Sequence, residues 1–417
     1  MRFKLISLGC KVNFYENNAL REMFLLNNYV EDNNNPDIVV INTCSVTKVA
    51  DQKSRQIIRR EKRKNPNSIV VVMGCSSQNH GEEILSSTGA DIVIGTSYRN
   101  KLLDLINEFK INNEKILKIN KDVRHLEYES FNVFTMPKST RAYIKVEDGC
   151  NNFCTYCTIP YTRGEVRSRN KDEIIAEITH LVSLGFKEFV LCGIHTAHYG
   201  LDLKDTTFSD LVEAILNIEG LYRLRISSIE ESEIDDKFIT LLANYPKLAN
   251  HLHMPLQSGS KTVLKRMGRK YNVDDFIKKV EKIRSVRPDI SITTDVIVGF
   301  PGESEEEFKE TYDFIEKIKF SELHVFPFSA REGTKAYLMD NQISPDVKSV
   351  RVDALLNLSK KLEKEYYNRF LGQELEVILE ERNKKTNLLS GFTSNYLKLS
   401  SDLSDDYIGK IVKLKVS

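Results

Sequence analysis

The chain has 417 residues, of which 41% are hydrophobic and 29% charged, and its formal net charge is +1. This length allows two or three domains with buried cores, and the near-neutral charge excludes nucleic-acid attraction by the field of the whole molecule, leaving local patches. No apolar run approaches the roughly 20 residues that span a bilayer, and the first residues carry no signal peptide. We therefore expect a cytoplasmic protein that does not contact a membrane.

The N-terminal part of the chain alternates short apolar runs with segments of helical periodicity. The runs predict strands at residues 3–7, 37–42, 68–73 and 91–95. Between them we expect helices at 13–27, 46–64 and 82–87 and from residue 100 onward. Strands that alternate with helices favour a parallel sheet covered by helices, so the predicted class is α/β. This domain should span residues 1–110, followed by a polar linker at 111–138 that ends at Met136-Pro137-Lys138.

A second alternation of strands and helices fills residues 139–369. Strands are expected at 142–147, 188–193, 222–227, 250–254, 291–298 and 321–326. Helices are expected at 171–184, 305–318 and, long and charged, at 346–370. Six βα units are too few for a closed eight-stranded barrel, which predicts a partial (β/α)6 barrel.

The last segment, residues 370–417, consists of short strand-like pieces with Gly391 and Gly409 at turns. The pieces lie at 374–379, 386–393, 396–399 and 410–416. They predict a small antiparallel barrel of OB-like type.

Three of the seven cysteines form the motif Cys150-x3-Cys154-x2-Cys157, directly after a predicted strand. Three thiolates at this spacing suit one [4Fe–4S] cluster whose fourth iron stays open to a small molecule. A structural zinc site is the alternative, but such sites normally use four ligands, and Cys192 and His195 belong to the next strand and its loop. The motif therefore favours an iron–sulfur cluster.

Cys10, Cys44 and Cys75 each follow a predicted strand of the N-terminal sheet. Because the carboxyl ends of parallel strands share one edge, these thiols are expected to converge. They are either buried structural cysteines or a second three-ligand cluster site. Gly9 and Gly74 favour the cluster site, since a glycine permits the tight turn that a cluster loop needs. The seventh cysteine, Cys192, lies in an apolar strand and is expected in the core.

These motifs are recognisable. Residues 149–160, Gly-Cys-Asn-Asn-Phe-Cys-Thr-Tyr-Cys-Thr-Ile-Pro, resemble the radical SAM signature of the methylthiotransferase family, as do Tyr161-Thr162-Arg163-Gly164 and Arg167-Ser168-Arg169. The resemblance covers the whole chain. Residues 1–110 resemble the family's auxiliary-cluster domain, 139–369 its radical SAM domain and 370–417, although short, its RNA-binding TRAM domain.

Within that family the chain most resembles the branch that methylthiolates C2 of N6-threonylcarbamoyladenosine at position 37 of tRNA. The resemblance rests on Leu8-Gly9-Cys10-Lys11-Val12-Asn13 and Asn42-Thr43-Cys44-Ser45-Val46-Thr47, supported by Gly193-Ile194-His195-Thr196. The isopentenyladenosine branch usually has Gln-Met-Asn after the first cysteine, and the ribosomal-protein branch has Pro-Lys-Asn. A sibling enzyme of either branch is the alternative.

The resemblance implies a transferase with two [4Fe–4S] clusters and S-adenosylmethionine. Cys150, Cys154 and Cys157 would hold the cluster that cleaves S-adenosylmethionine to a 5′-deoxyadenosyl radical, with an electron from a donor such as flavodoxin or ferredoxin. Cys10, Cys44 and Cys75 would hold the auxiliary cluster, whose sulfur is methylated by a second S-adenosylmethionine. No catalytic residue is expected beyond these ligands.

The ends of the predicted barrel strands offer contacts for S-adenosylmethionine. The resemblance suggests Tyr156 beside the adenine, together with Ser228, Glu230, Gln257 and Asp295. Each also has a structural interpretation; Glu230, for example, is equally a solvated loop acid.

Contacts with the tRNA anticodon loop are expected from one basic helix. Its candidates are Arg55, Arg59, Arg60, Lys62 and Arg63, which would contact phosphates, although a solvated helix face explains them equally well. The target base must be splayed out to enter a closed pocket.

Two further protein classes stay open. A non-catalytic iron–sulfur carrier would not cleave S-adenosylmethionine, and it has no need of an open iron. A radical SAM methyltransferase without sulfur insertion would keep its activity after loss of Cys10, Cys44 and Cys75.

Overall fold

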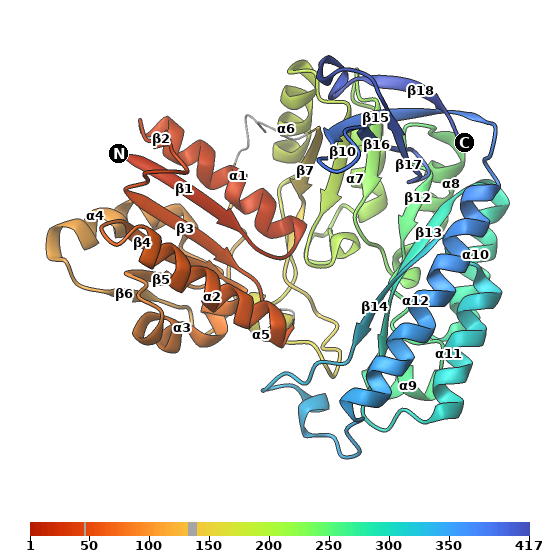
Figure 1. Cartoon of the computed structure of the whole chain (residues 1–417), viewed down its shortest axis with the longest axis horizontal. Coiled ribbons are helices and arrows are strands. Elements are labelled where there is room, and N and C mark those ends of the chain that lie inside the picture. Colours follow the sequence, from red (N-terminus) through yellow and green to blue (C-terminus); the bar gives the residue numbers. More distant parts are fainter. Residues whose placement is uncertain (46, 132–139) are drawn as a thin grey trace.

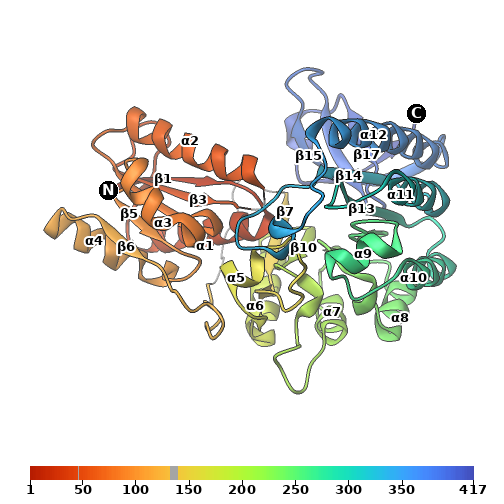
Figure 2. The same cartoon turned by 90° about the horizontal axis from the view of Figure 1, so that it is seen from below.

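The chain has a mixed α/β fold in which an N-terminal parallel sheet lies beside a partial barrel, with a small antiparallel sheet at one end of the barrel (Figure 1, Figure 2). The computed structural model describes residues 1–45, 47–131 and 140–417. Val46 and Met136-Pro137-Lys138, which belong to a predicted helix and the predicted linker, lie outside the described residues.

The N-terminal sheet is parallel throughout, in the order β2-β1-β3-β4-β5-β6. Its strands are β1 (Arg2–Ser7), β2 (Val30–Glu31), β3 (Ile38–Thr43), β4 (Ile69–Gly74), β5 (Ile92–Ile94) and β6 (Ile116–Lys118). The helices α1 (Lys11–Leu26) and α4 (Leu102–Asn112) cover one face, and α2 (Lys48–Lys64) and α3 (Cys75–Ser87) cover the other. Because both faces are covered, β3 and β4 are buried along their whole length, which explains their continuous apolar runs.

Two features of this unit differ from the prediction. α3 begins at Cys75 rather than near residue 82 and kinks at His80, because its polar first turn lacks the apolar periodicity that reveals a helix. The short edge strands β2 and β6 were not predicted, since two or three residues carry no detectable alternation. β6 carries the sheet into the segment that was expected to be a linker.

Among the described residues, six parallel strands form the partial barrel as two sheets, β7-β10-β11 and β12-β13-β14. A parallel bridge between Leu224 and Leu248 joins them. The strands are β7 (Arg141–Lys145), β10 (Glu188–Cys192), β11 (Arg223–Ile226), β12 (His251–His253), β13 (Ser291–Val298) and β14 (Glu322–Pro327). The fold class predicted from the sequence is confirmed.

Helices surround the barrel and bury its outer face in the largest core cluster. They are α6 (Lys171–Ser183), α7 (Phe208–Leu216), α8 (Asp236–Asn244), α9 (Lys261–Met267), α10 (Val273–Val286), α11 (Glu305–Ile318) and α12 (Pro345–Asn368). α11 begins where Ser304 and Glu307 form a capping box, and α12 begins where Ser344 precedes Pro345. These local signals explain why both helix starts were predictable.

Several short elements complete the central unit. β8 (Glu147–Asp148) pairs antiparallel with β9 (Arg167–Ser168), and α5 (Ile159–Arg163) lies between them in the chain. The central unit also contains the 3-10 helices η2 (Thr196–His198), η3 (Glu231–Glu233) and η4 (Lys335–Leu338), while η1 (Arg99–Lys101) lies in the N-terminal unit and η5 (Asp405–Tyr407) in the C-terminal one. Within the described ranges, no helix is both long and apolar enough to cross a lipid bilayer.

The C-terminal sheet is antiparallel and curled into a half-barrel, in the order β17-β16-β15-β18. Its strands are β15 (Glu374–Arg382), β16 (Leu389–Thr393), β17 (Lys398–Ser401) and β18 (Ile411–Lys415). Tyr366 and Phe370, at the end of α12, pack into its core.

The turn between β16 and β17 closes the amino-terminal end of the barrel. Tyr396 stacks on His251 of β12, with ring centroids 4.3 Å apart, and the Arg225 guanidinium lies 4.8 Å from the same Tyr396 ring. Arg225 also donates to the Thr393 carbonyl at 3.2 Å. Access to the interior of the barrel is therefore from the carboxyl ends of its strands.

Candidate functional site

Cys10, Cys44 and Cys75 lie at the carboxyl ends of three neighbouring strands, β1, β3 and β4. The register pairs Ser7 with Asn42 and Thr43 with Gly74, so the residues that follow these strands lie side by side. Cys75 accordingly interacts electrostatically with both other thiols. The structure thus brings these three sulfurs to one edge of the sheet.

Two glycines allow the three cysteine loops to approach one another. Gly9 has φ +92° and Gly74 has φ +100°, a conformation that other residues rarely adopt. A Cβ at Gly9 would collide with Cys44, and a Cβ at Gly74 would collide with Asn42 and Thr43. The close approach of the loops fits a compact group that is bound by all three thiols.

Cys150, Cys154 and Cys157 lie on the loop between β8 and α5, and all three are half-buried. The loop folds back on itself, because Cys157 N donates to Cys154 O at 3.0 Å and Cys150 N donates to Gly164 O at 3.0 Å. Arg269 donates from Nη1 to Cys154 Sγ at 3.3 Å. One short loop therefore presents three sulfurs at the open end of the barrel.

Burial raises the pKa of the Cys75, Cys150 and Cys157 thiols to about 12 each. A metal binds the thiolate, so these sulfurs need cationic partners in order to lose their protons. Iron ions would supply most of that charge. Both three-thiol sets therefore fit a [4Fe–4S] cluster in donor type. Five of the six thiols are buried or half-buried, and Cys10 is exposed.

Arg163 lies between the two sets of thiols. It ends α5, on the chain segment that follows Cys157, and it is fully buried. Its Nε donates to Cys75 Sγ at 3.2 Å, while Nη2 donates to Asn13 Oδ1 at 3.0 Å. One guanidinium thus links the loop of the second set to a sulfur of the first.

A buried network of charges surrounds Arg163. Its Nη1 donates to Glu16 at 2.8 Å and to Asp148 at 3.1 Å. Lys145 donates to the same two carboxylates at 3.0 and 2.6 Å, and Arg99 donates to Glu16 at 2.7 Å. Burial alone would raise the pKa of Glu16, but Arg163, Arg99 and Lys145 outweigh it and hold that pKa well below its usual value.

The residues predicted to contact S-adenosylmethionine are spread over the open end and the interior of the barrel. Tyr156 packs edge-on against Phe300, with ring centroids 6.3 Å apart. Glu230 forms an ion pair with Arg269 and accepts from Asn152 Nδ2 at 3.4 Å, so it is a paired acid and not a freely solvated one.

The other three lie on neighbouring strand ends. Ser228 follows β11, and Gln257 follows β12, with φ +64° and a bridge to Val296. Asp295, on β13, has its Oδ2 3.3 Å from His253 Nε2. Tyr156 lies on the cysteine loop itself, and Glu230 is linked to that loop through Arg269, whereas Asp295 lies deeper in the barrel.

Sequence reasoning set His195 aside because it belongs to the loop after the next strand, but the structure places it beside Cys150. Its Nδ1 lies 3.7 Å from Cys150 Sγ, and its Nε2 lies 3.1 Å from Glu233 Oε2. In the sequence, His195 follows Cys150 by 45 positions, so the spacing of the motif does not reveal their contact. The detectable signal was topological: β7 and β10 are adjacent, so the residues after each strand meet. Cys192, the seventh cysteine, is fully buried in the barrel core, as the sequence predicts.

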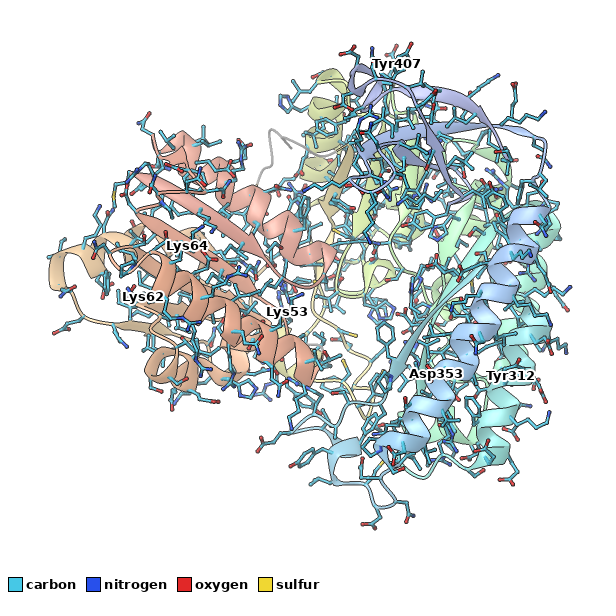
Figure 3. The ribbon with its side chains drawn as sticks, viewed as in Figure 1. Lys53, Lys62, Lys64, Tyr312, Asp353 and Tyr407 are labelled. Atoms are coloured by element: carbon cyan, nitrogen blue, oxygen red, sulfur yellow. The ribbon has the colours of Figure 1, made fainter. Side chains whose placement is uncertain are left out.

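The basic residues predicted to bind RNA lie along α2, where Lys53, Lys62 and Lys64 are visible in Figure 3. Arg55 pairs with Glu83, Lys62 with Asp91 and Arg60 with Glu61. Arg59, Arg60 and Arg63 are exposed. Intramolecular acids therefore engage Arg55, Arg60 and Lys62, whereas Arg59 and Arg63 are exposed and form no ion pair within the described residues.

A cavity of about 760 Å³ lies at the amino-terminal end of α2, where the N-terminal unit meets the barrel. Residues of α2, α3 and α5 line it together with the loop 330–337. Its charged lining includes Lys48, Arg55 and Arg331, with Arg331 paired to Asp51. The cavity is thus a polar groove beside the segment that holds Cys157.

The sequence has relatives along its whole length. Residues 144–315 match the Radical SAM superfamily, and residues 2–95 match a family described as Uncharacterized protein family UPF0004. The chain is 46% identical to the threonylcarbamoyladenosine tRNA methylthiotransferase MtaB of Bacillus subtilis (strain 168), over 98% of this chain and 92% of that protein. It is 34% identical to a tRNA-2-methylthio-N(6)-dimethylallyladenosine synthase of Caldicellulosiruptor saccharolyticus, over 99% and 89%.

Among solved structures, the fold resembles that of TsrM, a radical S-adenosylmethionine methyltransferase from Kitasatospora setae. The TM-score is 0.57 at 14% identity, over 78% of this chain and 73% of that chain. At such identity the likeness concerns the fold alone, and it supports the partial barrel.

Proposed function

Because the chain belongs to the radical SAM methylthiotransferases, we propose that it adds a methylthio group to C2 of N6-threonylcarbamoyladenosine at position 37 of tRNA. The full-length relative named for threonylcarbamoyladenosine is 46% identical, against 34% for the one named for dimethylallyladenosine, and this difference favours the first substrate. The observation that carries the proposal is the presence of two three-thiol sites, one in each α/β unit, joined through Arg163.

The thiols have separate roles in this proposal. Cys150, Cys154 and Cys157 bind the cluster that coordinates S-adenosylmethionine, and Cys10, Cys44 and Cys75 bind an auxiliary cluster. When bound, the cofactors supply one-electron cleavage of the sulfonium, a carbon radical and the transferred sulfur. An electron donor of the flavodoxin or ferredoxin class completes the system.

The chain's own residues position the cofactor and exclude water. The proposed contacts of S-adenosylmethionine, from the open end of the barrel to its interior, are Tyr156, Ser228, Glu230, Gln257 and Asp295. Arg269 holds Glu230 and donates to Cys154 Sγ, so the cofactor-facing acid and the cluster loop share one anchor. The turn that carries Tyr396 closes the opposite end of the barrel, which limits quenching of a radical by solvent.

The substrate nucleotide enters from the side of the N-terminal unit. Arg59, Arg60 and Arg63, with Arg55 and Lys62 beside them, contact phosphates of the anticodon arm. Residues 1–110 provide the auxiliary-cluster domain, 111–138 the linker, 139–369 the radical SAM domain and 370–417 a TRAM-like domain for further RNA contacts.

Anaerobic reconstitution tests the proposal. We expect about eight irons per chain for the wild type, and about four for the Cys10→Ala/Cys44→Ala/Cys75→Ala variant. With reductant, S-adenosylmethionine and tRNA from a strain lacking the modification, mass spectrometry of nucleosides should show the methylthio derivative of threonylcarbamoyladenosine. Dimethylallyladenosine in the same tRNA pool should stay unchanged, which serves as the matched control for substrate.

Each alternative predicts a different result. Conversion of dimethylallyladenosine, or of a ribosomal protein, would assign the chain to a sibling branch. Transfer of a methyl group that survives loss of Cys10, Cys44 and Cys75 would indicate a methyltransferase without sulfur insertion. Absence of 5′-deoxyadenosine under reducing conditions would reject the enzyme altogether.

A further inference from the structure

Lys11 lies where the N-terminal unit meets the barrel, and its side chain is exposed. Lys11 directly follows Cys10 and is the first residue of α1, whose next residues are fixed to the barrel by Phe14, packed edge-on against Tyr143 of β7 with ring centroids 5.2 Å apart. Its ammonium interacts electrostatically with groups on four different barrel strands, namely Arg141, Cys192, Arg225 and Asp295. Together with the packing of α1 against β7, these interactions place the Lys11 ammonium beside the interior of the barrel.

The other cations of the barrel interior have acidic partners. Arg223 and Arg225 pair with Glu188 at 2.9 and 2.8 Å, and Lys145 pairs with Asp148 at 2.6 Å. Asp295 is the acid that interacts with Lys11, and its Oδ2 lies 3.3 Å from His253 Nε2. Within residues 1–45, 47–131 and 140–417, the Lys11 side chain forms no hydrogen bond or ion pair. Among the described residues, Lys11 therefore brings to the barrel interior a positive charge that no acid pairs, and it directly follows Cys10 in the chain.

We propose that Lys11 binds the carboxylate of the threonyl group of the substrate, and so determines specificity for threonylcarbamoyladenosine; this inference rests on the proposed function. The threonylcarbamoyl group on N6 ends in a free carboxylate, which is the only full charge on the modified base. An anion in a closed barrel needs a cationic partner to offset its lost hydration.

The geometry of adenine explains the position of this lysine. C2 and N6 lie on the same edge of the base, with N1 between them. A base that presents C2 to sulfur bound near Cys10 therefore places its N6 substituent next to the adjacent residue. Lys11 is exposed in the free protein. An apolar dimethylallyl group in that place would displace water from the ammonium and offer it no partner in return, which disfavours that substrate.

Binding of anticodon stem-loop RNA by the reconstituted full-length enzyme tests this inference. One RNA carries threonylcarbamoyladenosine at position 37, a second carries unmodified adenosine, and a third carries the threonyl group as its carboxamide. We compare the wild type with Lys11→Met, which keeps the length and loses the charge, and with Lys11→Arg, which keeps the charge. Lys360→Met, at an exposed position on α12 far from α1, is the matched control.

We expect Lys11→Met to weaken binding of the threonylcarbamoyl RNA by about 10- to 100-fold, the range for loss of a charged hydrogen bond, with little change for unmodified RNA. Lys11→Arg should keep most of the preference, and Lys360→Met all of it, at equal iron content. The carboxamide RNA should bind the wild type as weakly as the acid binds Lys11→Met, a comparison that holds even if Lys11→Met loses iron.

Two outcomes would overturn the inference: an unchanged preference in Lys11→Met, or equal affinity of the wild type for the acid and the carboxamide. Either result, in an enzyme that still methylthiolates threonylcarbamoyladenosine, rejects the role of Lys11 alone. Failure of the wild type to modify that nucleoside rejects the proposed function itself, so the two failures are distinguishable.

Discussion

The Nε of Arg163 donates a hydrogen bond to Cys75 Sγ at 3.2 Å, across 88 positions of sequence. Arg163 belongs to the segment after Cys157, whereas Cys75 begins a helix of the N-terminal unit. The contact therefore ties the two sets of thiols together mechanically and electrostatically. A cationic donor to a ligand sulfur also stabilises negative charge on that sulfur, which favours the thiolate.

Arg163→Met should strongly destabilise the protein. The substitution leaves Glu16 and Asp148 buried with one cation fewer, and breaking a buried ion pair in this way costs about 3–5 kcal/mol. The free energy of unfolding, from urea titration, measures the loss. Arg59→Met, at an exposed position on α2, should change it by less than about 0.5 kcal/mol. Equal effects of the two variants would contradict the role of the buried network.

Gly9→Ala should remove the iron of the N-terminal site without altering any cysteine. The new Cβ would collide with Cys44, and the alanine would have to adopt φ +92°. The loops would therefore move apart, and the three sulfurs could no longer share one cluster. Iron analysis after reconstitution should fall from about eight to about four per chain. Gly185→Ala is the matched control, because φ is +94° there and nothing lies within 4 Å of the new Cβ. It should keep its iron and lose only about 1 kcal/mol of stability.

Glu188 should make folding stability depend on pH. Burial would raise its pKa, but Arg225, Arg141 and Arg223 outweigh burial and lower the pKa to about 2, from an ordinary value of 4.5. Because the folded pKa lies below the unfolded one, the stabilisation is complete above pH 4.5 and is lost as pH falls toward 2. It amounts to about 3 kcal/mol at neutral pH.

Urea unfolding of the wild type and Glu188→Gln, between about pH 7 and about pH 3, measures this contribution. The difference in the free energy of unfolding between wild type and Glu188→Gln should become smaller as the solution becomes more acidic. Parallel stability curves would show that Glu188 does not titrate as its contacts imply.

The exposed arginines of α2 should set the salt dependence of RNA binding. Replacing Arg59 or Arg63 with Gln should each reduce the slope of log K against log salt by about 1. Lys360→Gln, on α12 at the opposite side of the molecule, should leave the slope unchanged (Figure 3). If no α2 variant alters the slope, the RNA does not bind at these arginines. The cavity lined by Lys48 and Arg331 would then be the next candidate for the RNA interface.

Local patterns predicted much of this architecture. The buried runs that became β3 and β4, and the capping box that starts α11, depend on residues close in sequence, and the predicted α/β class with a partial barrel is confirmed. The start of α3 was missed, because Cys75-Ser76-Ser77 is polar and its helical state depends on packing against β5. The edge strand β6 was missed because three residues carry no periodic signal.

The sequence by itself determined which residue types carry the chemistry, since thiol spacing and strand-end position are short-range properties. The tertiary structure decided which side chains serve those thiols: Arg163 at Cys75, Arg269 at Cys154 and His195 beside Cys150. It also decided that Lys11 lies where the N-terminal unit meets the barrel. The physical reason is that these contacts join strand ends or separate units, and a side chain's partner there depends on how two packed surfaces meet, which no local pattern records.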